Sequence, residues 1–282
     1  MSTVTAKDKL GTLHRGGAAE IRFDRSPDGK SYISAQRVGY PFHITRPFYL
    51  QGDPPGMPSL YLQSVSGGIY EDDRLDLNVA AGAGALAHVT TQAATIVHQM
   101  EDAHAVQQME ITAADDSLLE YMPDPLVLFP YADLVSCVRV VCAPSATVMV
   151  SDAYLSHDPQ GADRRFSRLR AELRIERPGG SLLSLDRFDI SGEQFVGDGA
   201  FRAHGSFACV TPHAIRELIK QLHPVLDQAV DCYAGVSELP AGAGLWVRVL
   251  ARDSHALRVA ITSTWAKLRS SMFGSTPQAR PK

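Results

Sequence analysis

Short strand-like segments follow one another through most of this 282-residue sequence, and they constrain its fold more than any other feature. From about residue 18 to residue 207, runs rich in β-branched or alternating residues are each closed by Gly, Pro, Asp or Asn. The run 19–23 alternates and stops at the turn sequence Ser26-Pro27-Asp28-Gly29, after which a second strand begins near Lys30. Further strands are expected at 59–65, 74–79, 87–91, 105–113, 117–121, 134–141, 147–156, 169–177 and 182–190. The connections are too short for crossover helices, so this body is predicted to be all-β.

Helical patterns are confined to the C-terminal end. Thr211 is suited to cap a first helix, which is expected to end near His223, ahead of Pro224. After an apolar strand at 245–250, Ser254 can cap a second helix that Gly274 ends. The sequence has no Ser/Gly linker long enough to separate domains, because the stretch 51–58 is a surface loop in this interpretation. One domain over 1–282 is expected, with flexible tails at 1–17 and 275–282.

Composition excludes several classes of protein. Hydrophobic residues make up 45% of the chain, which is enough for a sizeable core and excludes a disordered chain. The net charge is -4 and the basic residues are scattered, so no nucleic-acid partner is expected. Four cysteines without a C-x-x-C spacing indicate a reducing compartment. The polar N-terminus and the lack of a run of 18 apolar residues predict a soluble, cytoplasmic protein without membrane contact.

Acidic residues and histidines supply the candidate chemistry. Glu71-Asp72-Asp73, with Glu120 and Asp124, could provide oxygen ligands or an acid/base pair, although a solvated turn at 71–73 is the simpler interpretation. His88 and His98 could contact a metal in passing, but ordinary hydrogen-bonded histidines explain them as well. The Gly-rich run 82–87 precedes a strand rather than a helix, which disfavours dinucleotide binding. With no nucleophile elbow or paired-histidine motif, the residues alone favour a binding or assembly role.

Three motifs, in order along the chain, carry a resemblance to a known family. They are Gly67-Gly68-Ile69 followed by Asp73-Arg74-Leu75, then the run Thr-Thr-Gln-Ala-Ala-Thr at 90–95, and then Leu-Glu-Tyr-Met-Pro-Asp-Pro at 119–125. This succession resembles the urease accessory protein UreD family, also called UreH, and the similarity runs over most of the chain. Departures are Glu71-Asp72 in place of Gly-Gly, Ile96 in place of Lys, an altered segment near Gly161, and a different C-terminal ending.

The resemblance implies a non-catalytic scaffold in the assembly of a nickel enzyme. UreD-like proteins bind urease apoprotein and UreF, and the GTPase UreG joins through UreF, so that nickel reaches urease. The implied fold is a mainly β, two-layered, β-helix-like stack of short strands with two C-terminal helices. No tightly bound cofactor is implied, because polar passages with carboxylates would hold nickel weakly while it is in transit.

The resemblance also suggests where these functions lie. Asp73, Glu120 and Asp124 fall in the matched segments and are predicted to face an internal passage for nickel, with Asp72, His88 and His98 as weaker candidates. Structural roles for Glu120 and Asp124, as a partner of buried backbone donors and a turn cap, are the alternative. The apolar faces of the C-terminal helices are expected to contribute to UreF binding or, equally, to pack on the chain's own sheet; their representatives are Ile215, Ile219, Leu222 and Trp265.

Two further functions remain open at this stage. One is a β-solenoid hydrolase or lyase that uses Asp72, Asp73 and Glu120, although aromatic residues are only 7% of the chain and both tryptophans fall in core-like patterns. The other is an assembly factor that keeps the UreD fold but serves a different partner. The departures near Ile96, near Gly161 and at the C-terminus keep this alternative open.

Overall fold

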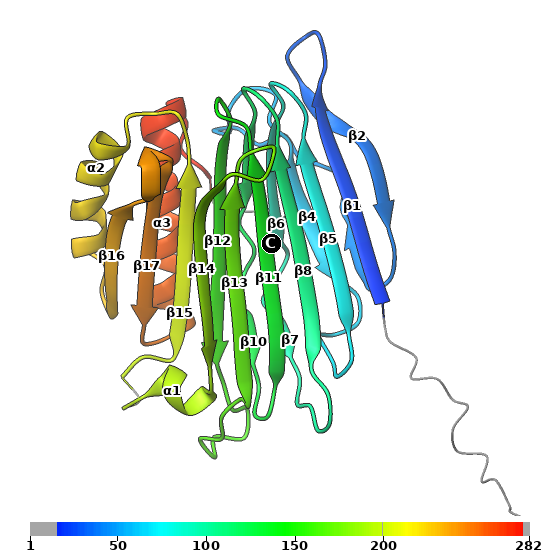
Figure 1. Cartoon of the computed structure of the whole chain (residues 1–282), viewed down its shortest axis with the longest axis vertical. Coiled ribbons are helices and arrows are strands. Elements are labelled where there is room, and N and C mark those ends of the chain that lie inside the picture. The colour runs from blue at the N-terminus through cyan, green and yellow to red at the C-terminus, as the bar shows by residue number, and fades with distance from the viewer. Residues whose placement is uncertain (1–15, 199, 279–282) are drawn as a thin grey trace, which may run out of the picture.

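Two stacked β-sheets form the body of the protein, and two helices cover the outer face of one of them (Figure 1). The computed structural model describes residues 16–198 and 200–278. The mainly β, solenoid-like fold expected from the sequence is confirmed. The expected tails lie largely outside the described residues, at 1–15 and 279–282, but Gly16 and Gly17 belong to the first strand rather than to a tail.

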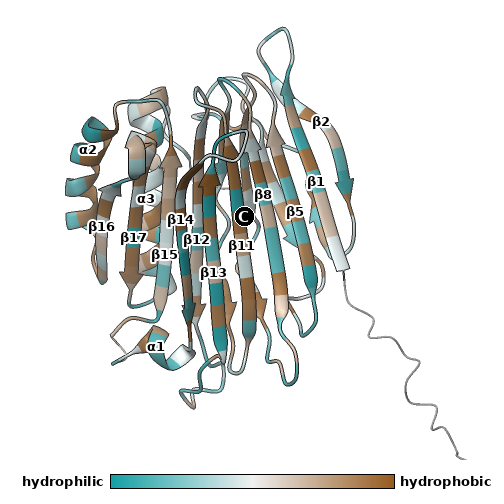
Figure 2. Ribbon diagram, in the orientation of Figure 1, coloured by the Kyte–Doolittle hydropathy of each residue, from teal (hydrophilic) through white to brown (hydrophobic). Residues whose placement is uncertain are grey.

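Sheet A is the seven-stranded sheet at the front of Figure 1. Its strands, in spatial order, are β14 (Leu182–Ile190), β13 (Arg168–Glu176), β11 (Asp133–Cys142), β8 (Ala105–Ala113), β5 (Arg74–Ala81), β1 (Gly16–Arg25) and β2 (Ser31–Val38). The five inner strands are parallel to one another, and β14 and β2 are antiparallel edges. Apolar and polar residues alternate along these strands in Figure 2, as expected for a sheet with one buried and one solvated face.

Sheet B is the ten-stranded sheet behind it. Its main row contains β16 (Cys232–Glu238), β17 (Gly244–Ala251), β15 (Ala203–Val210), β12 (Thr147–Ser156), β9 (Leu118–Tyr121), β6 (Leu86–Thr91), β4 (Ser59–Ser64) and β3 (Phe42–Ile44). Two short strands, β7 (Thr95–Val97) and β10 (Leu126–Leu128), pair with each other, and β10 also pairs with β12. The sheet is parallel from β4 to β12 and antiparallel beyond β12.

The chain crosses from one sheet to the other at every turn of a coil between β4 and β13. Equivalent residues therefore stack in register, as Leu75, Gln107 and Ser136 do in sheet A. His88 and Glu120 stack in the same way in sheet B. One hydrophobic core lies between the sheets and includes Phe23 and Val140, and a second lies between sheet B and the helices. This stacking brings residues about one coil apart in sequence into contact, which positions the site described below.

The helices agree with the sequence in place but differ in detail. Helix α2 (Ile215–Asp227) begins after Ala214 and continues past Pro224, so the expected cap at Thr211 and the expected stop near His223 are wrong. The Thr211 hydroxyl instead pairs with that of Thr147 at 2.9 Å. A short helix α1 (Gly192–Val196) and a 3₁₀ turn η1 (Pro240–Gly242) were not expected.

The last helix follows the expected span closely. Helix α3 (Ser254–Phe273) is capped by Asp253, whose carboxylate accepts the Ala256 N–H at 2.8 Å, rather than by Ser254. Gly274 ends it in the left-handed conformation with φ 65°, as predicted. In the described part of the chain, no helix is long and apolar enough to cross a membrane.

Candidate functional site

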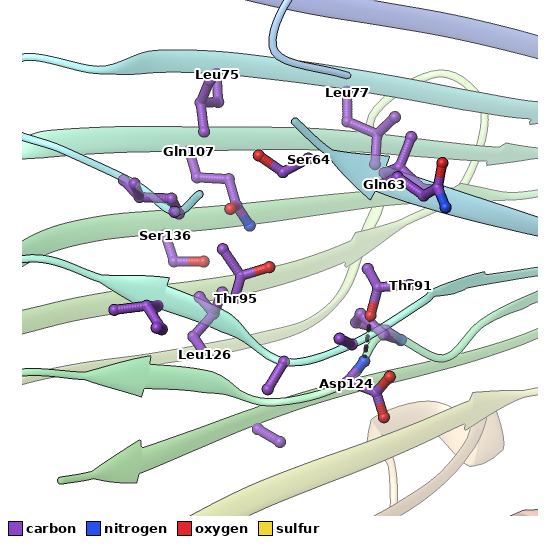
Figure 3. A pocket seen from close by; sticks show the side chains of 18 of the residues that line it. Gln63, Ser64, Leu75, Leu77, Thr91, Thr95, Gln107, Asp124, Leu126 and Ser136 are labelled. Carbon is purple, nitrogen blue, oxygen red and sulfur yellow. Dashed lines mark hydrogen bonds between the residues drawn. The ribbon is translucent and has the colours of Figure 1, made fainter. Parts of the chain in front are cut away.

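A cavity of about 270 Å³ lies between the two sheets, and all three sequence motifs reach it. Sheet A contributes the stacked side chains of Leu75, Gln107 and Ser136. Sheet B contributes Thr91 and the second stacked row Thr95, Leu126 and Tyr154, and the motif loops contribute 67–69, 92–94 and 123–124. Figure 3 shows Gln107, Ser136 and Thr95 gathered in one part of the cavity and Thr91 and Asp124 in another. The motifs are distant in sequence but line one space.

The cavity forms where two strands of sheet B are interrupted. Strand β6 ends at Thr91 and β7 begins at Thr95, while β9 ends at Tyr121 and β10 begins at Leu126. Pro123 and Pro125 fall in the second interruption, and proline cannot donate a ladder hydrogen bond. The interruption opens space that continuous strands would fill with side chains.

Asp124 is the predicted site residue that the structure places in the cavity wall. Its backbone N–H donates to the Thr91 Oγ1 at 2.8 Å, which fixes the loop against β6 (Figure 3). Its Oδ2 is buried and has no hydrogen-bond partner among the described residues. A buried carboxylate oxygen without a hydrogen-bond partner is costly to the fold.

Asp152 is a second carboxylate in the cavity wall, and the sequence analysis missed it. Its Oδ1 accepts the Ser206 N–H at 3.0 Å. Burial raises the pKa of Asp152 to about 6, against the hydrogen bonds from Ser206, which lower it. The signal that was available is that Asp152 is the one charged residue of the predicted strand 147–156.

The raised pKa of Asp152 predicts a pH effect on stability. A carboxyl whose pKa is higher in the folded state binds more protons there, so its contribution to stability falls as pH rises from about 4 to about 6. Asp152→Asn should therefore be more stable than the wild type at pH 8, by about 1–3 kcal/mol, and the difference should shrink toward pH 4. Urea denaturation of both proteins at the two pH values measures this. A difference that does not change with pH would contradict the assignment.

Glu120 does not face the cavity. It lies on the opposite face of β9, toward α3, and is fully buried. The Arg269 Nε donates to its Oε1 at 2.8 Å, a second Arg269 nitrogen bonds its Oε2, and the His88 Nδ1 lies 2.8 Å from that oxygen. The expected passage role of Glu120 thus has no support in its position. Its partners are side chains, not the backbone donors that the structural alternative named.

Arg269 links this buried carboxylate to a distant loop. Its guanidinium also pairs with Asp53, and both side chains are at most 5% exposed. The ring of Trp265 stacks on His88 at 4.9 Å between centroids, and the Arg269 guanidinium lies 4.6 Å from the Trp265 ring centroid. Although burial alone would raise the pKa of Glu120, the hydrogen bond from His88 and the charge and hydrogen bonds of Arg269 lower it to about 2. Glu120 is therefore ionised, and the network is a structural one.

The remaining acidic and histidine candidates lie around the loop that precedes β5. Asp73 is buried, and its Oδ2 accepts the Tyr70 N–H at 2.8 Å. Asp72 takes a left-handed backbone with φ 64°. His98 stacks on Tyr70 with 4.3 Å between centroids. None of these three side chains lines the cavity.

The neighbouring Glu71, one of the departures from the family pattern, has a clear local role. Its Oε1 accepts backbone N–H groups of Glu101, Asp102 and Ala103 at 2.6–3.1 Å, and these bonds lower its pKa. Glu71 therefore holds the loop before β8 in place.

Metal ligands do not gather at one point. Among residues 16–198 and 200–278, no group of three or more His, Cys, Asp or Glu is placed to hold a metal ion. Asp73, Glu120 and Asp124 occupy three different environments, and the acid/base set Asp72, Asp73 and Glu120 of the hydrolase alternative is divided between the loop before β5 and the helix side of sheet B. The cavity therefore offers isolated oxygen groups rather than a preformed metal centre.

The predicted partner-binding residues lie in the core. Ile215, Leu222 and Trp265 are buried and Ile219 packs partly buried against the same cluster, between sheet B and the two helices. The alternative left open by the sequence, packing on the chain's own sheet, is what the structure shows. Sheet B and the helices cover Ile215, Leu222 and Trp265, whereas the side chain of Ile219 stays partly exposed. A contribution of these residues to UreF binding stays a prediction.

Gly68 of the first motif is required by close packing at the cavity wall. Its φ is 148°, and a Cβ there would lie 2.5 Å from the Ile96 carbonyl oxygen and 2.7 Å from the His98 ring. Gly68→Ala should lower the free energy of unfolding by about 2–3 kcal/mol. Gly235→Ala is the control, since nothing lies within 4 Å of that position. Equal stability of the two variants in urea denaturation would show that the loop adjusts freely.

The fold and the cavity define a β-solenoid-like protein with a cavity of mixed apolar and polar lining between its two sheets. The chain belongs to the UreD family, because the family model described as UreD urease accessory protein matches residues 15–282. It is 40% identical over 270 residues to urease accessory protein UreD 1 of Pseudomonas syringae pv. syringae, covering 94% of this chain and 95% of the relative.

Other relatives agree over similar lengths. UreD 1 of Pseudomonas syringae pv. tomato is 38% identical and covers 99% of this chain and 100% of the relative. UreD 1 of Methylorubrum populi is 39% identical, covering 90% of this chain and 88% of the relative. These are accessory proteins rather than enzymes, so the hydrolase or lyase alternative is set aside.

Proposed function

We propose that this chain is a cytoplasmic scaffold of urease maturation that binds urease apoprotein and UreF, is joined by UreG through UreF, and helps to deliver nickel to urease. Family membership supports the maturation role. The observation that carries the more specific proposal is the cavity, because all three family motifs line it although they are separated in the sequence.

The chemistry of the cavity suits a cation in passage. Its polar lining consists mainly of neutral oxygen and amide groups, such as those of Gln107, Ser136 and Thr95, with the carboxylates of Asp124 and Asp152. Oxygen ligands hold Ni²⁺ more weakly than imidazole or thiolate, so an ion can enter and leave. Ile96, which stands where the family pattern has Lys, also lines the cavity. The isoleucine places no ammonium group there that would repel a passing cation.

Asp124 is proposed as the carboxylate that a passing ion meets, because its buried Oδ2 has no partner among the described residues. Asp124→Asn keeps the size of the side chain and the backbone hydrogen bond to Thr91 but removes the charge. We expect it to lower the rate of urease activation several-fold, in cells that lack the wild-type chain, without loss of the complex with UreF and UreG.

The matched control is Asp116→Asn, since Asp116 is an exposed acid in a turn outside the cavity. Urease activity after addition of nickel, together with co-purification of UreF and UreG, measures both parts of the prediction. Activation at the wild-type rate by Asp124→Asn would remove Asp124 from the route. Loss of the complex would instead show a structural role for this residue.

A further inference from the structure

Sheet B extends beyond the edge of sheet A. Sheet A ends at β14, which pairs only with β13 in the described part of the chain. Sheet B continues through β15 and β17 to β16, and Figure 1 shows β17 and β16 standing clear of the last strand of sheet A. An eighth strand in sheet A, placed next to β14, would cover the inner face of β17 and β16. Without such a strand this inner face, called the shelf below, lies uncovered beside an open sheet edge.

The shelf and the edge of β14 enclose a groove of about 740 Å³. Tyr233 of β16 and Leu250 of β17 form part of its floor, and Leu185 of β14 stands at its side. These three apolar side chains are 73%, 39% and 42% exposed. Gly235, on the same floor, has nothing within 4 Å of its Cβ position. An exposed apolar patch next to an unpaired strand is a typical place for another chain to bind.

Trp246 provides an independent indication that the groove takes a hydrogen-bonding ligand. Its side chain lines the groove and is 6% exposed, and its indole Nε1 has no hydrogen-bond partner among the described residues. Arg248 lies over the indole ring, 5.4 Å from its centroid, and is held there by an ion pair with Asp186. A buried N–H donor without an acceptor is costly, and a backbone carbonyl of a bound peptide would satisfy it.

The charges of the groove favour a basic residue in the ligand. Asp186 and Glu238 line it with a single Arg248, and Arg248 already pairs with Asp186. Among the described residues, the ion pair of Glu238 is with the largely exposed Arg216 at 3.9 Å, which is a weak pairing. A Lys or Arg side chain of a ligand near Glu238 would therefore be favoured.

We propose that an extended segment of a partner protein adds to the free edge of β14 and covers the shelf. Its backbone pairs with β14, one of its carbonyls accepts from the Trp246 indole, its apolar side chains pack on Leu185, Tyr233 and Leu250, and a basic side chain lies near Glu238. The proposal rests on the proposed function, because the partner is taken to be urease apoprotein or UreF.

A photocrosslinker tests this on the full chain. Benzoylphenylalanine at position 185 should crosslink to one segment of urease apoprotein or UreF, identified by mass spectrometry. The same group at position 32 should not, because Tyr32 is equally exposed but lies on β2, the opposite edge of sheet A. Amides of β14 should exchange more slowly with deuterium in the complex, while those of β2 should be unchanged.

Charge substitutions give the affinity test. Tyr233→Glu and Leu185→Glu should each weaken binding by at least about tenfold, and Tyr32→Glu should not change it. All three side chains are exposed, so circular dichroism and the melting temperature should stay at wild-type values.

The possible outcomes separate this proposal from the proposed function. A complex that forms with unchanged exchange in β14 and without crosslinks from position 185 would overturn the docking site but leave the scaffold role intact. Crosslinks between two copies of this chain would overturn it in favour of self-pairing. If neither urease apoprotein nor UreF binds, the partner role fails and this proposal fails with it.

Discussion

Glu120→Ala should lower the free energy of unfolding by about 3–5 kcal/mol, the cost typical of removing one partner of a buried ion pair. The substitution leaves the guanidinium of Arg269 without its main counter-charge in a layer where it is completely buried. Because many domains have a total stability of only about 5–15 kcal/mol, we expect a large shift in the urea midpoint.

The expected loss of stability in Glu120→Ala is large because the network joins several elements of the fold. Glu120 lies on β9, His88 on β6, Arg269 on α3, and Asp53 in the loop after β3. Arg269 therefore fastens the C-terminal helix to two parts of the chain that lie 149 and 216 residues away in sequence. Removing the Glu120 carboxylate therefore weakens a network that joins several elements rather than a single contact.

Two comparisons make the prediction specific. Arg216→Ala removes an exposed ion pair and should change stability by less than about 0.5 kcal/mol. The double substitution Glu120→Leu with Arg269→Leu removes both charges. The double variant should be less destabilised than Glu120→Ala alone, although Asp53 then loses its charged partner and keeps the hydrogen bond from Ser59. Stability of Glu120→Ala close to that of the wild type would show that the network contributes little.

Deleting the gene for this chain should leave urease expressed but nearly inactive. In the proposed function, the chain helps nickel to reach the apoenzyme. Urease made without the chain should therefore lack nickel in its active site, while synthesis of the urease subunits is unchanged. Urease activity per amount of urease protein measures the effect, and the purified chain should show no hydrolase activity of its own.

Complementation provides the control for this experiment. The wild-type gene should restore activity, and the Asp124→Asn variant should restore it more slowly. A variant altered only at the exposed control position, Asp116→Asn, should restore it fully. Full activity in the uncomplemented strain would contradict the proposal.

The strands were predictable where their pattern was long and their ends were marked. The spans 105–113, 147–156 and 182–190 coincide with β8, β12 and β14. Alternation and closing turn residues are local properties of the sequence, so they can be recognised without knowledge of the fold. Strands β3, β7 and β10 are only three residues long, too short to show a period, and exist because the coil places a partner strand beside them.

The site was predictable only in part. When both faces of a strand are buried, its sequence does not show which side chains point to which side. Leu118, Leu119, Glu120 and Tyr121 are all buried, so their polarity does not show which side chains face sheet A and which face α3. The sequence could therefore not show that Glu120 faces α3 rather than the cavity. Asp124 follows the strand in a proline-rich loop, and the place of that loop at the cavity depends on the stacking of coils.

The helices carried the same ambiguity. Ile215, Leu222 and Trp265 form apolar faces that would have the same pattern whether a partner or the chain's own sheet covered them. The structure shows that sheet B covers them. Among the apolar residues that stay exposed, Tyr233 lies on β16, a strand that the sequence analysis did not predict, and Leu250 lies on the predicted apolar strand 245–250.

The nickel content of urease from the deletion strain tests the central claim most directly. Urease purified from this strain and from its wild-type parent, in the same nickel-containing medium, should differ sharply in nickel per active site by elemental analysis. We predict that the deletion strain yields urease with the normal subunits but little nickel, and that the wild-type gene restores the metal. Urease with the normal nickel content in the absence of this chain would contradict the maturation role.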